Sequence, residues 1–274
     1  MARSAAILVP TIGSRPALLR LLIEVLQAQL GKLNATDVSI VVGVDGACSQ
    51  PVDVGEVTLV FTEQFGAAAV RNHLARTVDT EWLVFLDDDV LPHPGWADAL
   101  MRNMLQTRVC AGAIDPPALF ARADVGRLQQ SLGVKWFGPT PRRLGRFEHL
   151  AAGHLAIRRD VFLRAGGFRR VPGGRNEDVD LHYRLHDWPG VWWAPDLRVD
   201  HLGRARGGDF DWYAQGLSDA ATDSVLPARL RLQQGVKVLS RSVLRPGEMR
   251  RARGYLTALV AKALPTSIEP SGVE

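Results

Sequence analysis

The sequence predicts an α/β fold in which a mostly parallel central sheet is flanked by helices. Short apolar runs without helical periodicity alternate with segments of helical spacing, which is the pattern of buried parallel strands and the helices that connect them. Acidic residues follow directly on one apolar run, at the strand end where ligands bind in such sheets. The expected strands are Ala5–Val9, Val38–Val44, Val57–Phe61, Trp82–Leu86 and Val109–Ile114.

Helical spacing links these runs. The leucines and valine of Leu18–Leu26 lie on one helical face, with Ser14 as the expected cap and Pro16 in the first turn. Gly66–Thr77 and His93–Thr107 are two further helical segments. The alternation of strand and helix therefore extends through the first half of the chain.

Composition excludes several classes of protein. Of 274 residues, 46% are hydrophobic and 23% charged, which is typical of a globular protein with a substantial core. The apolar runs are far shorter than the ~20 residues of a membrane span, and two cysteines give no disulfide framework. We expect a cytoplasmic protein. The three-glycine dinucleotide fingerprint, the GxxxxGK[ST] loop, and the GxSxG, HExxH and CxxC motifs are all absent from the sequence.

The charge pattern divides the chain into two parts. Residues 227–262 contain nine Lys and Arg against one Glu, whereas the rest is mildly acidic. We therefore predict a catalytic domain over residues 1–225 and a basic, amphipathic, helical extension over 226–274, broken at Pro246-Gly247. Such helices either lie on an anionic membrane surface or pack on the body, and the sequence leaves both open. Nucleic acid is not an expected partner, because no reader motif accompanies the charge.

The first acidic cluster, Asp87-Asp88-Asp89, comes directly after the expected strand Trp82–Leu86. Three adjacent carboxylates repel one another unless positive charge is supplied. Mg²⁺ or Mn²⁺ would supply it, since these ions bind one or two carboxylates together with substrate phosphates. The alternative is a solvated acidic turn or a helix cap.

The second acidic cluster opens an expected helix from about Glu177 to Asp187. Acidic residues are favoured at a helix N-terminus by the helix dipole alone. Asp178, His182 and His186 also share one helix face at spacings of four residues, which makes a zinc hydrolase a second hypothesis.

These motifs, taken in order, resemble the family 2 glycosyltransferases of the GT-A fold. The resemblance covers about residues 5 to 203 and not the tail. The segments that carry it are Pro10-Thr11 with Arg15-Pro16, Val44-Asp45-Gly46, Gly66–Asn72 with its Arg71-Asn72 pair, Trp82–Asp89, Gly166-Gly167-Phe168, and Asn176–Leu185. One departure is Val70, which precedes the arginine where the family has alanine.

The resemblance implies a role for each matching residue. Asp178 matches the base that activates the acceptor, with Glu177 beside it. The implied metal ligands for Mn²⁺ or Mg²⁺ are Asp89, Asp87 and His201. The implied donor-binding residues are Pro10, Thr11, Arg15, Asp45, Arg71, Asp87 and Asp88.

The function expected from this resemblance is inverting, metal-dependent transfer of a sugar from a UDP-, GDP- or dTDP-sugar to an acceptor hydroxyl. The acceptor would be a saccharide, a lipid-linked molecule or a small natural product, and residues 116–150 with Trp136 and Phe137 are expected to select it. Arg204 and Arg206 are candidates for a lid over the diphosphate. Two alternatives are a nucleotidyltransferase and a non-catalytic glycan-binding or scaffold relative; the first lacks its phosphate loop here.

Overall fold

The computed structural model describes residues 4–33, 37–49, 51–116, 135–172, 174–202, 212–224, 226, 228–242, 246–260 and 269–270. The strands of the main sheet are β1 (Ala5–Thr11), β2 (Val38–Val44), β3 (Thr58–Phe61), β4 (Trp82–Leu86), β5 (Val90–Pro92), β6 (Val109–Asp115), β7 (Arg142–Arg143), β8 (His154–Arg158) and β10 (Trp192–His201). A short pair, β9 (Arg169–Arg170) and β11 (Glu269–Pro270), forms a second sheet.

The main sheet is mixed. Its strand order is β3-β2-β1-β4-β8-β6-β10-β5, with β7 paired to β10. β3, β2, β1 and β4 are parallel, as the alternating pattern predicts, and β6 is parallel to β10. β8 is antiparallel to both β4 and β6, and β5 and β7 are antiparallel to β10. The expected parallel arrangement therefore holds on one side of β4.

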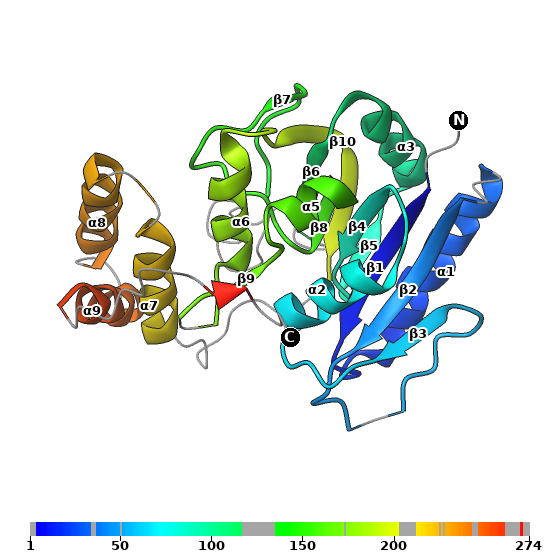
Figure 1. Ribbon diagram of the computed structural model, residues 1–274, viewed down its shortest axis with the longest axis horizontal. Helices are drawn as coiled ribbons and strands as arrows, with labels where there is room; N and C mark the ends of the chain where they lie inside the picture. The colour runs from blue at the N-terminus through cyan, green and yellow to red at the C-terminus, as the bar shows by residue number, and fades with distance from the viewer. Residues whose placement is uncertain are drawn as a thin grey trace.

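Helices cover both faces of this sheet (Figure 1). Side chains that alternate along β1 and β4 enter two separate cores. One core packs α1 (Pro16–Lys32) and α3 (Trp96–Gln106) on the sheet. The other packs α2 (Ala67–Thr77), α5 (Arg159–Arg164) and α6 (Glu177–His186). Since both faces are covered, the sheet exposes mainly its ends to ligands.

The expected strands and helices agree closely with the observed ones. Val38–Val44 and Trp82–Leu86 have the predicted bounds, and Pro16 begins α1 as expected. β1 continues two residues beyond its expected end, to Thr11, and β6 ends one residue later, at Asp115. These extra residues matter because they carry polar side chains to the end of the sheet.

Three helices follow the sheet: α7 (Trp212–Asp223), α8 (Ala228–Ser242) and α9 (Pro246–Val260). They lie together beside α6, away from β1 to β3 (Figure 1). The two expected tail helices are present, and α9 begins at Pro246, where the break between them is predicted, since a proline fits the first helical turn. α7 shares a small core with α8 and α9, although it precedes the predicted boundary at residue 225.

In the described part of the chain, no helix combines the length and the apolar character needed to cross a bilayer.

Candidate active site

The acidic segment Asp87 to Asp89 lies where β4 ends, so the buried strand fixes its position. The Asp87 amide donates to the Gly153 carbonyl at 3.2 Å, just before β8. Gly153 also packs directly under this carboxylate, because a Cβ there would lie 2.1 Å from Asp87 Oδ2. The strand end and the glycine together set the direction of the Asp87 side chain.

Arg15, at the start of α1, neutralises the other two carboxylates. Its guanidinium pairs with Asp88 Oδ1 at 3.0 Å and also with Asp89. Thr11 Oγ1 donates to Asp88 Oδ2 at 2.6 Å and accepts the Gly13 amide at 3.0 Å. Burial raises the pKa of Asp88, while Thr11 and Arg15 oppose that rise. Arg15 thus supplies the positive charge that these two adjacent carboxylates need.

Arg71 on α2 connects the two acidic clusters. Its side chain is only 4% exposed, and its guanidinium binds both Asp87 and Glu177 Oε1, the latter at 3.3 Å. Burial favours a lower pKa for Arg71, but Asp87 and Glu177 outweigh it and the pKa is raised. Residues separated by about a hundred positions in sequence therefore meet at one buried cation.

The second acidic cluster lies in the first turn of α6. Burial, together with the neighbouring Asp178, raises the pKa of Glu177. Asp178 is partly exposed, and its Oδ1 accepts the Val179 amide at 2.8 Å. The two carboxylates thus differ in their partners: Glu177 binds Arg71, and Asp178 accepts a backbone amide of its own helix.

Asp45 holds two loops together. Its Oδ1 accepts the Ala47 amide at 2.8 Å and its Oδ2 accepts the Gly66 amide at 2.6 Å, directly before α2. A cavity of about 190 Å³ lies between these segments and the acidic strand end. The predicted donor residues all line it: Pro10, Thr11, Arg15, Asp45, Arg71, Asp87 and Asp88, together with Asp89.

The three predicted metal ligands are only partly brought together. His201 Nε2, at the end of β10, lies 3.6 Å from Asp89 Oδ1, and Leu202 donates its amide to the Asp89 carbonyl at 2.7 Å. Asp87 is drawn away to Arg71. Asp89 and His201 offer a carboxylate oxygen and an imidazole nitrogen, which fit Mn²⁺ when diphosphate oxygens complete the coordination.

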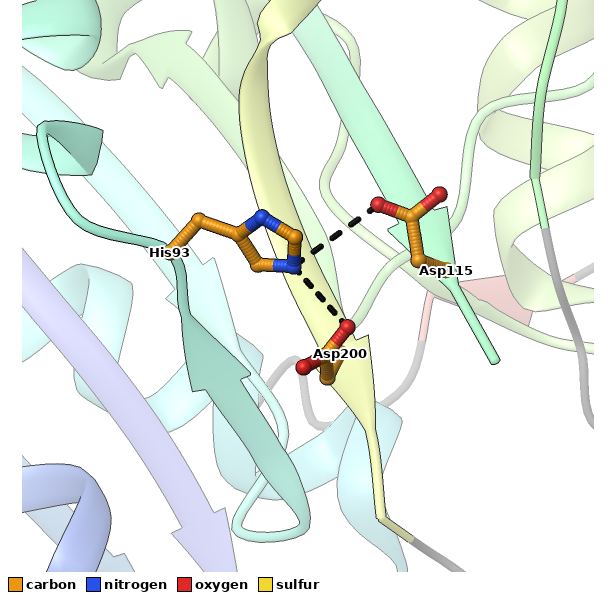
Figure 2. Close-up of side chains that lie close together, drawn as sticks. All are labelled: His93, Asp115 and Asp200. Carbon is orange, nitrogen blue, oxygen red and sulfur yellow. Dashed lines mark hydrogen bonds and ion pairs between the residues drawn. The ribbon is translucent and has the colours of Figure 1, made fainter. Parts of the chain in front are cut away.

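Within the described residues, a different set of three gathers closely enough to hold a metal ion: His93, Asp115 and Asp200 (Figure 2). The alternative zinc set of Asp178, His182 and His186 is not gathered in this way. His182 is buried against the Gly145 carbonyl at 3.1 Å, where burial lowers its pKa to about 4.

Sequence reasoning missed this second set and the partners of α6. Asp115 follows directly on an expected strand, the same signal that marked Asp87, so it was detectable. Asn176, just before α6, exchanges hydrogen bonds with Gln215 and Asp219 of α7, and no sequence signal marks these contacts. Arg204, Arg206 and residues 117–134, for which a lid and acceptor selection are expected, lie outside the described residues.

Comparison with solved structures defines the class of this fold. The mannosyltransferase PcManGT from Pyrobaculum calidifontis, in complex with GDP-Man and Mn²⁺, superimposes with a TM-score of 0.59 at 17% identity, over 97% of this chain and 77% of that one. GalNAc-T7 with UDP, GalNAc and Mn²⁺ gives 0.54 at 15% identity, over 84% and 53%. The fold is the GT-A fold of glycosyltransferases.

The chain belongs to glycosyl transferase family 2, whose description matches residues 7–164, more than half of its length. The O-antigen biosynthesis protein RfbC of Myxococcus xanthus is 28% identical over 203 residues, covering 66% of this chain and 16% of that relative. The chain therefore spans a small part of the length of that relative. The family resemblance predicted from the motifs is confirmed.

Proposed function

We propose that this protein is an inverting glycosyltransferase that moves a sugar from a nucleoside-diphosphate sugar to an acceptor hydroxyl. The single observation that carries the proposal is the buried Arg71, which joins Asp87 at the end of β4 to Glu177 at the start of α6. Glycosyl transfer needs a leaving-group site and a separate base close together. Arg71 brings the two acidic clusters together in that way.

The donor would occupy the cavity between Thr11, Asp45 and the acidic strand end. Asp89 and His201 would hold Mn²⁺ or Mg²⁺, which supplies positive charge to the departing diphosphate. Arg15 carries that positive charge in the structure, since it pairs with both Asp88 and Asp89. With Asp89 engaged as a metal ligand, the Arg15 guanidinium would be free to bind diphosphate oxygens.

Asp178 would take the proton from the acceptor hydroxyl. Glu177 is bound to Arg71, so its charge is already engaged, whereas the Asp178 carboxylate accepts the Val179 amide. A base facing the sugar from the side opposite the leaving group gives in-line displacement and inverts the anomeric centre. Glu177 would then position Arg71 and Asp87.

The acceptor would approach from the end of β6 and β10, near Trp136. This side chain is partly exposed, and its ring packs edge-on against the buried Trp193 at 6.0 Å between ring centroids. An anchored, exposed indole suits stacking on a sugar ring. The exposed apolar residues of α8, Leu232 and Val236, lie near basic residues and would suit an anionic membrane carrying a lipid-linked acceptor.

Two substitutions test the separation of roles. We expect Asp89→Ala to abolish the Mn²⁺-dependent part of donor binding, because it removes the carboxylate next to His201. We expect Asp178→Asn to leave donor affinity within about twofold and to lower turnover by at least a hundredfold, in line with general-base contributions of roughly 10²–10⁴. Isothermal titration with UDP-, GDP- and dTDP-sugars measures donor affinity. NMR of the product follows turnover and identifies the anomer that forms.

Asp79→Asn is the matched control, because that carboxylate is fully exposed and pairs only at 3.6 Å with Arg159. It should change neither quantity. Unchanged metal-dependent binding in Asp89→Ala would remove the metal assignment, and normal turnover in Asp178→Asn would remove the base. If no nucleotide sugar binds the unmodified protein with Mn²⁺, the non-catalytic alternative is favoured.

A further inference from the structure

A second group of metal-ligating side chains lies on the other side of β10 from His201. It consists of His93, just after β5, Asp115, at the end of β6, and Asp200, on β10 (Figure 2). Asp200 pairs in register with Asp115, so these two carboxylates project from neighbouring strands on the same face of the sheet. His201, the next residue, projects to the opposite face.

The three ligand atoms lie close together. His93 Nε2 is 2.8 Å from Asp200 Oδ1 and 3.8 Å from Asp115 Oδ2, and one ligand atom of each residue lies within 4.8 Å of the other two. Tetrahedral bonds of about 2.0–2.2 Å place neighbouring ligand atoms at roughly 3.3–3.6 Å from each other. The observed separations bracket that range, so small side-chain rotations would complete the geometry.

The backbone around His93 is fixed before any ligand binds. Its amide donates to the Arg198 carbonyl at 3.0 Å, and its own carbonyl accepts the Gln29 side chain at 3.0 Å and the Trp96 amide at 3.1 Å. Asp115 and Asp200 belong to paired strands. Because the backbone of all three ligands is held in place, metal binding would lose little conformational entropy.

Arg198 is the competing cation at this site. Its guanidinium binds Asp115 Oδ2 at 2.7 and 2.9 Å and packs over the Trp136 ring at 5.4 Å from the centroid. It balances one of the two carboxylates, which leaves Asp200 as the second negative charge beside a single imidazole. Asp115 and Asp200 are both half-buried, and an ion bound through Asp115 Oδ2 would compete with Arg198 for that oxygen.

We propose that His93, Asp115 and Asp200 form a second metal site, which binds a divalent transition metal, foremost Zn²⁺, without any nucleotide. One imidazole and two carboxylates suit Zn²⁺ or Mn²⁺ better than Mg²⁺ or Ca²⁺. The ion joins the β5–α3 turn to the ends of β6 and β10. Because Asp200 precedes His201, the ion also fixes the strand end that carries the donor-side histidine.

Calorimetric titration of the metal-stripped full chain with Zn²⁺ alone tests the site. We expect one equivalent to bind, Asp115→Asn to weaken binding at least tenfold, and Asp89→Asn to leave it within about twofold. Asp79→Asn is the matched control. Should Asp115→Asn misfold by circular dichroism, His93→Gln replaces it, and anomalous diffraction from a Zn²⁺-soaked crystal locates the ion directly.

Each outcome decides the matter. Zn²⁺ binding lost in Asp115→Asn and kept in Asp89→Asn, with an anomalous peak at His93 Nε2, supports the site. Absence of nucleotide-free Zn²⁺ binding means that His93 serves only as an ion-pair partner of the two aspartates, and overturns it. Binding lost in Asp89→Asn and kept in Asp115→Asn places the ion at the donor site and also overturns it. Since no nucleotide is used, these results are independent of the proposed sugar transfer.

Discussion

At the scale of single residues, Arg71 connects the two acidic clusters of the site. A guanidinium presents several donors in a fixed plane, so one side chain can bind two carboxylates at once. Asn72, the next residue, also fixes α2, because its side chain exchanges hydrogen bonds with the Phe168 backbone at 2.7 and 2.9 Å. The pair of adjacent residues therefore links α2 both to the acidic strand end and to the turn after α5.

Gly153 gives a sharp prediction at this scale. In Gly153→Ala the new methyl group would collide with the Asp87 carboxylate and push it away from Arg71. We expect a loss of about 1–3 kcal/mol in the free energy of unfolding, the usual cost of overpacking, together with weaker donor binding. Urea denaturation and donor titration measure the two effects.

Gly31→Ala is the control for this substitution. Gly31 lies in α1 with open space around its Cβ position, and alanine is favoured over glycine in a helix by up to ~1 kcal/mol. That variant should be as stable as the parent or more so. Equal stability of the Gly153 and Gly31 variants would contradict the close approach to Asp87.

At the scale of elements, the last three helices form a unit with a buried carboxyl group at its centre. Asp223, at the end of α7, accepts a hydrogen bond from the Tyr255 hydroxyl of α9 at 3.1 Å. Burial raises the pKa of Asp223 to about 7, and the nearby Asp219 adds to the rise while Tyr255, Arg251 and Lys237 oppose it. The neutral acid is therefore the form that packs best.

The sign of the resulting pH dependence follows from this raised pKa. Protonated Asp223 stabilises the fold, and that stabilisation is lost as the pH rises from about 4, the unfolded value, through 7. Asp223→Asn mimics the neutral form at every pH. The free energy of unfolding of this variant, relative to that of the parent, should therefore be about 2–3 kcal/mol higher at pH 8 than at pH 5. Urea denaturation at the two pH values checks this, and a constant difference would contradict it.

At the scale of the whole molecule, one aspartate joins the helical unit to the start of α6. Asp219 on α7 accepts Asn176 Nδ2 at 2.8 Å and Gln215 Nε2 at 2.9 Å, and it pairs with Arg251 of α9. Asn176 has a positive φ of 65°, a conformation that asparagine tolerates better than most residues. The backbone just before Glu177 and Asp178 is thus held from α7.

We expect Asp219→Asn to lower turnover at least tenfold and to leave donor affinity within about twofold, because it loosens the acceptor-side carboxylates and does not touch the donor cavity. Steady-state kinetics and donor titration separate the two. Asp53→Asn removes an exposed pair with Arg20 and should change neither. A parallel loss of donor affinity in Asp219→Asn would indicate general disruption of the fold.

The sequence predicted well which segments are buried strands, but it predicted poorly whether neighbouring strands are parallel or antiparallel. The apolar run Trp82–Leu86 is a strand in either orientation, so periodicity could not reveal that β8 would enter antiparallel beside it. Motifs marked Asp87, Glu177 and Arg71 as site residues but did not reveal the contacts between them, because those contacts depend on how α2 and α6 pack across the sheet. Long-range partners such as Asn176 and Asp219 arise only from that packing.

The connection between β4 and β5 is very short for the distance that it must bridge. Three residues, Asp87 to Asp89, join strands that β8, β6 and β10 separate in the order of the sheet. The four steps from Leu86 to Val90 reach at most ~14 Å in an extended chain, whereas four strand spacings in a flat sheet amount to ~19 Å. The sheet must therefore curl until its far edge returns toward β4.

The curvature of the sheet thus sets the distance that the acidic segment spans between β4 and β5. The ends of this segment are held by the strands β4 and β5, and the Val90 amide closes a turn onto the Asp87 carbonyl at 3.5 Å. Lengthening this segment by one residue would leave every acidic side chain in the sequence and still separate Asp89 from His201. The curl of the sheet, more than the identity of the aspartates, sets the spacing at which a cation can be held.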